Sequence, residues 1–267
     1  MYTDQFIYDN MHRLKYISFI TLGLLLVFSS CKPLFRKDRS LTFKEYQLHG
    51  MPDINMPWPE DKLMKAHVAI GSVRMRNFYA LPVKNSRRSG AVFSHLLSPD
   101  NLSFLDDTTA SLRDKAFQIQ AYWSFISDLG LIYNDNFSQK QYYSRELTDI
   151  FVYQLYVRKK MFELADRIDK ASDPLDVGMQ KGRLAISESY VFLIEGMIGK
   201  QEKTGSFTPR QLRKMDRAVL ESVKENSKNL DPESRGKLLE AVKKQSEKGY
   251  PENVKKSLAE MLKFLKQ

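Results

Sequence analysis

The stretch QKQYYSRELTDIFVYQLYVRKKMFELADRIDK, residues 139–170, decides the fold of this chain. Its apolar residues, among them Leu147, Ile150 and Leu164, recur at the period of about 3.6 residues that marks one face of a helix. The middle of the stretch, Phe151–Val157, is apolar or aromatic almost all round, so we expect other elements to contact it on several sides. The sequence therefore predicts one long helix here, packed among other helices.

Amphipathic patterns of the same period cover three further segments, residues 60–77, 112–133 and 178–199. Within the last of these, Tyr190–Ile198 is the most apolar segment that follows residue 30, and we expect it to form the central helix of a bundle. A membrane-spanning helix is the alternative. The apolar run is short for a span and includes Glu195, and both facts argue against that alternative.

Residues 207–267 are rich in lysine and contain three shorter amphipathic patterns. The pairs Thr208-Pro209, Asp231-Pro232 and Tyr250-Pro251 open them, and proline at the first helical position is typical of a helix start. Because helices this short are marginal alone, we expect a C-terminal subdomain or a continuation of the main bundle over residues 60–200. The predicted fold class is all-α, a multi-helix bundle preceded by an irregular N-terminal tether.

The N-terminal segment is typical of an export signal and not of a fold element. Arg13 and Lys15 precede the apolar run Ile17–Phe28, and small residues follow it. This order of charged, apolar and small residues is that of a signal peptide. The run is also shorter than the roughly 20 residues that a membrane-spanning helix needs. We therefore predict a signal peptide over residues 1–30, with Met11 as an alternative start.

The box Phe28-Ser29-Ser30-Cys31 resembles the cleavage site of the bacterial lipoprotein signal class, over the N-terminal 31 residues only. The resemblance implies cleavage before Cys31 and acylation of its thiol by a lipid such as palmitate. The chain is then similar to a Bacteroidota-type envelope lipoprotein, and we expect it on the outer membrane, facing the periplasm. Residues 31–59 would be the lipidated tether and irregular segment. The alternative is an uncleaved N-terminal anchor.

Charge and cysteine content narrow the classes of function. The formal net charge is +10, and the signal segment carries equal numbers of acids and bases, so the basicity belongs to the folded part. Cys31 is the only cysteine, which excludes an intrachain disulfide and a cysteine-based metal site. An exported protein is a poor partner for nucleic acid in spite of its basicity. Glycine-rich phosphate loops and zinc-binding helix motifs are missing, and we predict neither a metal nor a cofactor.

The segment Leu81–Gly90 is the best candidate for an anion-binding site in the sequence. It holds Lys84, Arg87 and Arg88 together with two serines. Arginine side chains and backbone amides near Gly90 could bind a phosphate or a carboxylate, and a helix that begins there would add its dipole. The alternative is an exposed loop whose charges face water.

Glu195 is the weak candidate for acid–base chemistry. It lies seven residues after Glu188, hence on the same face of the predicted helix. A buried carboxylate with a raised pKa can act as a general acid or base, and Glu195 sits in the most apolar segment. The alternative is a structural ion pair between Glu195 and Arg158 or Arg183.

Three functions remain open from the sequence. The first is a non-catalytic adaptor or scaffold, anchored through lipidated Cys31, with an envelope protein as its partner. The second is a binding module for an anionic envelope glycolipid or a cell-wall fragment, which uses Lys84, Arg87 and Arg88. The third is an envelope polymer hydrolase with Glu195 as its general acid. We expect the first of these functions. An enzyme is less expected than a binding or scaffold protein, because no recognised catalytic spacing is present.

Overall fold

The computed structural model describes residues 38–135, 140–171, 176–202 and 205–267, without the side chains of residues 176–181 and 202. Residues Arg39–Gln267 form one compact unit. The described residues contain helices and no strand, which confirms the predicted all-α bundle. The predicted signal peptide and Cys31 lie outside the described residues.

The structure contains helices of six to 27 residues. They are α2 (Phe43–Leu48), α3 (Glu60–Arg76), α4 (Gly90–Leu96), α5 (Leu112–Tyr133), α6 (Ser144–Lys170), α7 (Asp176–Gly199), α8 (Pro209–Asn226), α9 (Pro232–Ser246) and α10 (Glu252–Leu265). The predicted long helix is α6, which begins at Ser144; the residues around its predicted start at Gln139 lie outside the described part.

Caps fix the starts of the long helices. The side chain of Ser111 accepts a hydrogen bond from the backbone N–H of Asp114 and so caps α5. Thr208 and Gln211 form a capping box at the start of α8, and Asp231 caps α9. Such caps satisfy backbone donors that have no partner inside the helix, and each stabilises its helix by about 1 kcal/mol.

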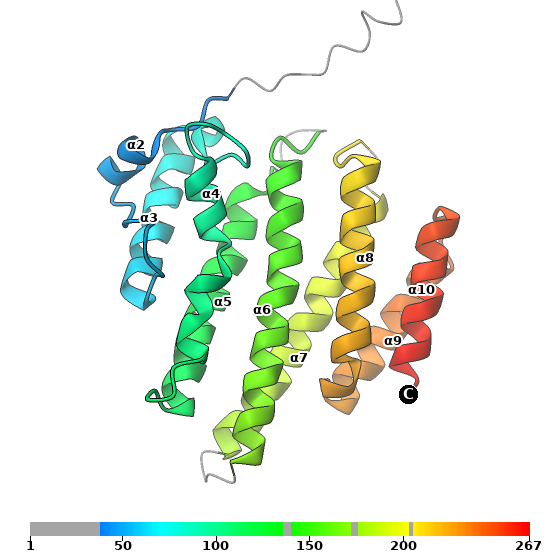
Figure 1. Ribbon diagram of the computed structural model, residues 1–267. Coiled ribbons are helices and arrows are strands. Elements are labelled where there is room, and N and C mark those ends of the chain that lie inside the picture. The colour runs from blue at the N-terminus through cyan, green and yellow to red at the C-terminus, as the bar shows by residue number, and fades with distance from the viewer. Residues whose placement is uncertain (1–37, 136–139, 172–175, 203–204) are drawn as a thin grey trace, which may run out of the picture. The chain divides into compact units, whose positions relative to one another are not determined.

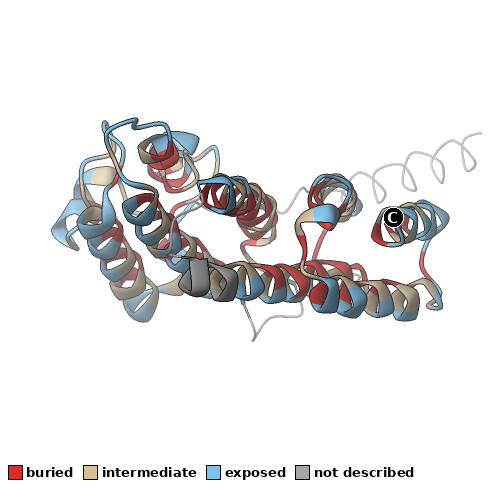
Figure 2. Cartoon of the chain, turned by 90° about the horizontal axis from the view of Figure 1, so that it is seen from below, coloured by how far each residue is buried: buried red, intermediate tan, exposed pale blue. Residues whose placement is uncertain are grey.

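Helices α6, α8 and α10 lie in one row, and α7 and α9 lie behind that row (Figure 1). Helix α6 packs against α5, α7 and α8, which is the many-sided contact that its sequence predicts. The segment Tyr190–Ile198, predicted to be the central helix, packs within α7 against α6, α8 and α9. Phe192 of this segment is 78% exposed. Buried residues lie along the faces by which neighbouring helices meet (Figure 2).

The segment over residues 31–59, predicted to be irregular, contains α2. Thr42 and Glu45 form a capping box that stabilises this short helix. Buried Tyr46 donates a hydrogen bond to the carbonyl oxygen of Ala80, 2.6 Å away. The backbone N–H of buried Trp58 donates one to Asn101 Oδ1, 2.8 Å away. These contacts anchor the described part of the segment, from residue 38 onward, to the bundle.

The C-terminal helices continue the bundle, with no boundary between residues 200 and 207 that divides the compact unit. Helix α8 packs against both α6 and α7. The amide nitrogen of Gln211 donates a hydrogen bond to Ser144 Oγ, 3.1 Å away, and so joins the starts of α8 and α6.

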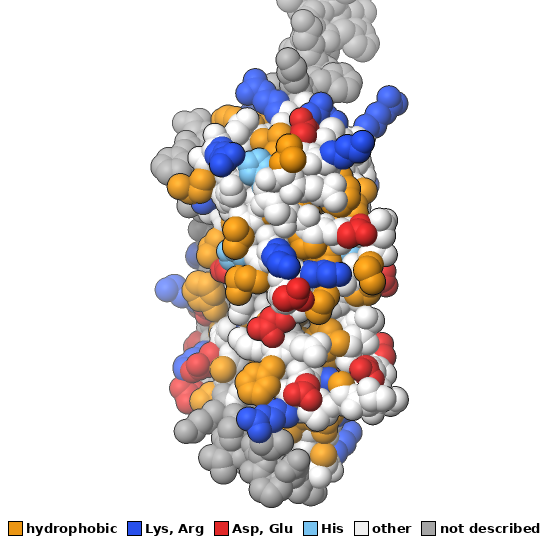
Figure 3. Space-filling model, turned by 90° about the vertical axis from the view of Figure 1, so that its left-hand side faces the viewer, with side chains coloured by type: hydrophobic (Ala, Val, Ile, Leu, Met, Phe, Trp, Pro, Cys, Tyr) orange, Lys and Arg blue, Asp and Glu red, His pale blue; other side chains and the backbone are white. Residues whose placement is uncertain are grey.

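The surface of the α2–α3 side carries hydrophobic side chains scattered among charged ones (Figure 3). On α3, Met64, Val68 and Met75 are exposed and share one helix face, because they are spaced by four and seven residues. In the described part of the chain, every helix falls short of the length and apolarity that crossing a membrane requires.

Candidate functional site: a cavity between α5, α6 and α7

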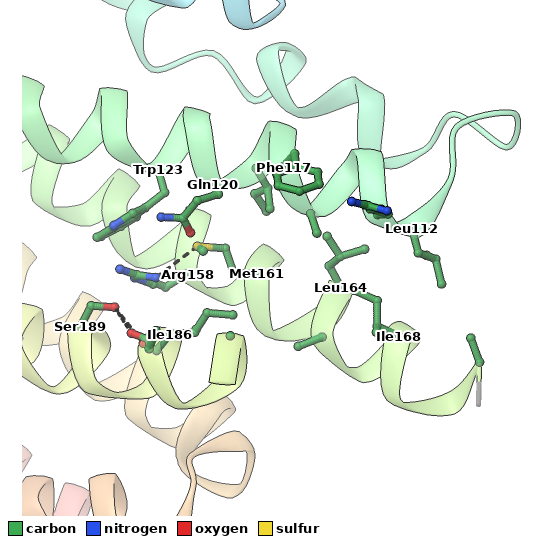
Figure 4. A pocket seen from close by; sticks show the side chains of 17 residues that line it. Leu112, Phe117, Gln120, Trp123, Arg158, Met161, Leu164, Ile168, Ile186 and Ser189 are labelled. Atoms are coloured by element: carbon green, nitrogen blue, oxygen red, sulfur yellow. Dashed lines mark hydrogen bonds between the residues drawn. The ribbon is translucent and has the colours of Figure 1, made fainter. Parts of the chain in front are cut away.

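A cavity of about 700 Å³ lies between α5, α6 and α7 (Figure 4). Helix α6 packs against both α5 and α7, so it forms the floor while the other two helices form the walls. Each helix contributes residues at helical spacing. The lining consists of Leu112, Arg113, Ala116, Phe117, Ile119, Gln120, Trp123, Arg158, Met161, Leu164, Ala165, Ile168, Ala171, Gly182, Ala185, Ile186 and Ser189.

The described lining includes several small side chains, which leave space between the three helices. Ala116 lies on the α5 wall, Ala165 on the floor, and Ala185 on the α7 wall. Gly182 has no side chain, and a Cβ atom built there would meet nothing within 4 Å. Protein interiors are normally packed with few voids larger than a water molecule. A space of this size therefore sets this part of the bundle apart from the rest of its core.

The two ends of the cavity differ in the exposure of their cations: Arg113, beside Leu112 and Phe117, is exposed, whereas Arg158 is buried. Leu112, Phe117 and Ile168 lie toward one end, while Trp123 and Arg158 lie toward the other (Figure 4). Two of the lining residues, Arg113 and Arg158, are charged, and both are cationic. An apolar cavity with a few polar groups at one place is the usual form of a small-molecule site.

Arg158 is the most informative residue of the cavity. It is 2% exposed, and its guanidinium carbon lies 3.4 Å from the centre of the Trp123 ring. One terminal nitrogen, Nη1, donates to the sulfur of Met161 at 3.2 Å, which is a weak acceptor. Nε is buried and has no hydrogen-bond partner among the described residues. Within the described chain, no carboxylate forms an ion pair with Arg158.

Burial makes this cation costly. Loss of hydration lowers the pKa of Arg158 to about 9. The side chain therefore remains charged at pH 7, and the face of Trp123 compensates for part of the lost hydration through a cation–π interaction. An anion beside Arg158 would supply the counter-charge that the described residues do not.

The loop predicted to bind anions has two of its three cations, Lys84 and Arg88, engaged within the protein. Lys84 Nζ lies 2.5 Å from Asp149 Oδ2, and Lys214 pairs with the other oxygen of the same carboxylate. Arg88 donates to the carbonyl oxygen of Ser40 at 2.7 Å and pairs with Glu45 at 3.2 Å. Lys84 and Arg88 thus tie the loop to α6 and to α2. Arg87 is exposed and stands apart from these pairs.

Glu195 is exposed and not buried as its apolar neighbours in the sequence suggested. Burial was the reason to propose Glu195 as a general acid or base, so that reason no longer holds. The two arginines that were expected to pair with Glu195 have other contacts. Arg183 pairs with Asp166 and Asp169, both at 2.6 Å, and Arg158 faces the cavity. Glu188 lies 3.9 Å from Lys237 on the surface.

Sequence patterns alone did not identify the cavity. Trp123 fits the apolar face of α5, and Arg158 interrupts the apolar face of α6, so each has an ordinary structural explanation. The one available signal was the excess of alanine and glycine on the facing sides of three neighbouring helices. That signal becomes visible only when the packing of α5, α6 and α7 is known.

The described residues contain no group of three or more histidine, cysteine, aspartate or glutamate side chains that could hold a metal ion. Comparison of the chain with protein-family models, curated proteins and solved structures finds no match.

Proposed function

We propose that this protein is a non-catalytic binding protein that holds a small molecule with an apolar body in the cavity between α5, α6 and α7. The cavity itself is the observation that carries the proposal. Its volume of about 700 Å³ falls within the range of roughly 300–1,000 Å³ that is typical of ligand pockets. This proposal keeps the idea of a binding module but moves the site away from Lys84, Arg87 and Arg88.

An apolar ligand would gain free energy in this cavity by leaving water. Each methylene group that is buried contributes about 0.8 kcal/mol. The side chains of Leu164 and Ile168 on the floor and of Phe117 on the wall offer the apolar surface for those contacts. A short acyl chain could therefore bind non-covalently with micromolar affinity.

The cell envelope is the place where we propose that this protein works. The proposal rests on the signal-like segment before Cys31, which predicts export and lipidation at that residue. A lipid anchor would hold the cavity close to a membrane, which is a source of apolar ligands. Replacement of Cys31 by alanine should release the exported protein from the membrane fraction; retention of Cys31→Ala there would contradict the lipid anchor.

Binding of 1-aminoanthracene, a neutral apolar probe whose fluorescence rises in apolar surroundings, tests the proposed function. We expect saturable binding of one probe per chain. The double variant Ala116→Phe/Ala185→Phe fills the cavity from both walls and should abolish binding. The matched control Ala91→Phe/Ala259→Phe places the same side chains at exposed positions of α4 and α10. Equal binding by both double variants, or none by the wild type, would contradict the proposal.

The adaptor function remains the second candidate, because the exposed face of α3 offers Met64, Val68 and Met75 to a partner protein. Affinity purification from detergent-solubilised envelopes, with Cys31→Ala in parallel, tests it. A stoichiometric protein partner that is lost when Met64 and Met75 are replaced by glutamate would support this function. Purification without such a partner would argue against it.

A further inference from the structure

We propose that the ligand is a single-chain amphiphile with a compact anionic head, a carboxylate or a phosphate, and that Arg158 binds this head at the inner end of the cavity. This inference rests on the proposed function, because it requires that the cavity bind a ligand at all. It adds the chemical class of the ligand, its orientation, and the residue that determines its specificity.

The geometry of Arg158 leaves donors for an anion. Trp123 covers one face of the guanidinium group, at 3.4 Å from ring centre to carbon, and so fixes its plane. The Met161 sulfur accepts only a weak hydrogen bond from Nη1, and Nε has no hydrogen-bond partner among the described residues. A guanidinium group presents its N–H donors in a planar fork, which matches the two oxygens of a carboxylate or phosphate.

The charge of the cavity favours an anion over a cation or a neutral head. Among the described residues that line the cavity, none is an aspartate or a glutamate. The two charged members, Arg113 and Arg158, are both positive. Buried charges in proteins are normally paired, because an unpaired charge loses its hydration without compensation. A negatively charged head beside Arg158 would complete that pair.

Burial of Arg158 limits the size of the head. Only 2% of this side chain is exposed, to the cavity and the outside together, so a head that carries sugars would not reach it. The head must therefore be compact and must enter first. Ser189 lies at the same end of the cavity, but its hydroxyl group already donates to the carbonyl oxygen of Ala185 at 2.6 Å, which leaves Arg158 as the donor for the head (Figure 4).

The tail of the ligand would then point toward the opposite end of the cavity, where Leu112, Phe117 and Ile168 lie. Leu112 and Trp123 lie eleven residues apart on α5, which corresponds to about 16 Å along the helix axis. At this end the exposed Phe117 ring and Arg113 stack at 5.7 Å and form part of the rim. Dodecanoate, whose extended length is of that order, is the probe of choice.

Displacement of 1-aminoanthracene from the full chain at pH 7 by dodecanoate, dodecyl phosphate and dodecan-1-ol tests this inference. We expect at least one of the two anions to displace the probe roughly tenfold to a hundredfold more effectively than the alcohol, as a charge-assisted hydrogen bond would predict. The comparison of carboxylate with phosphate identifies the preferred head. Arg158→Met should remove the preference for the anion, and Arg158→Lys should keep part of it.

Arg87→Met serves as the control, because it removes an exposed arginine outside the cavity and should leave the preference intact. Equal displacement by anion and alcohol, or a preference that persists in Arg158→Met, would overturn this inference while the proposed function stands. If 1-aminoanthracene itself does not bind, the proposed function fails together with the inference. Thermal unfolding shows whether Arg158→Met is folded, and if it is not, the result for Arg158→Gln decides.

Discussion

The guanidinium carbon of Arg158 lies 3.4 Å from the centre of the Trp123 ring, on the inner wall of a cavity whose described lining includes no acidic residue. This stacking holds a buried cation in place without a carboxylate partner. Such an arrangement costs stability and is expected where function requires it, because proteins often trade stability for a binding site.

Replacement of Arg158 by methionine should not destabilise the ligand-free protein. The variant loses a cation–π contact but also removes a buried charge that has no counter-ion. We expect the free energy of unfolding to rise by about 1 kcal/mol, because the second effect is the larger. Urea denaturation of ligand-free wild type and variant measures the difference. A clear loss of stability would mean that Arg158 is a structural residue.

The affinity for dodecanoate should depend on pH through Arg158. Burial lowers the pKa of this side chain to about 9, so the cation is present below that pH and is lost as the pH rises above it. We expect constant affinity between pH 7 and 8 and a steep decrease as the pH passes through about 9 to 10. Titrations across this range measure it. Affinity that stays constant up to pH 10 would contradict an ionic contact with Arg158.

Asp149 should contribute more to stability than an ordinary surface carboxylate. Its side chain is 11% exposed and pairs with Lys84 from the loop and with Lys214 from α8. Asp149→Asn should lower the free energy of unfolding by about 1–3 kcal/mol, because two lysines lose their partner. Glu163→Gln is the control: its pair with Lys160 is exposed, and its loss should cost under about 0.5 kcal/mol. Similar losses in both variants would contradict this role.

A pair of buried tyrosines should make the protein sensitive to alkali. Tyr153 donates to the carbonyl oxygen of Ser98 at 2.8 Å, and Tyr122 then donates to Tyr153 at 3.1 Å. Burial raises the pKa of Tyr122 to about 12 and also raises that of Tyr153. Unfolded tyrosines ionise near pH 10, so stability should fall as the pH rises from 10 toward 12.

The measurement for this pair is phenolate absorbance against pH, in wild type and in Tyr153→Phe. The variant should lose about 1–2 kcal/mol at pH 7, because Ser98 loses its donor and Tyr122 its acceptor. A wild type whose tyrosines all titrate near pH 10 while it is still folded would be inconsistent with this pair.

Sequence patterns predicted the helices well wherever local chemistry determines the ends. Thr208-Pro209 and Asp231-Pro232 mark the starts of α8 and α9 because capping and proline act within one turn. The same local patterns did not reveal α2, which has only six residues and is stabilised by its capping box and by the burial of Tyr46.

The functional residues were harder to predict for a different reason. Lys84, Arg87 and Arg88 are close in sequence, but Lys84 and Arg88 pair with carboxylates that lie far away in the chain. Glu195 lies in an apolar segment, yet its own position on α7 faces solvent. A cavity arises where three helices fail to fill the space between them. That failure depends on tertiary packing and has no local signature.

A crystal structure of the full chain with bromine-labelled dodecanoate is the most direct test of a ligand site between α5, α6 and α7. We predict one ligand in the cavity, with its carboxylate about 3 Å from the nitrogens of Arg158 and its bromine near Leu112 and Ile168. A bromine position outside the cavity, or α7 closed onto α5 with no ligand between them, would contradict the account.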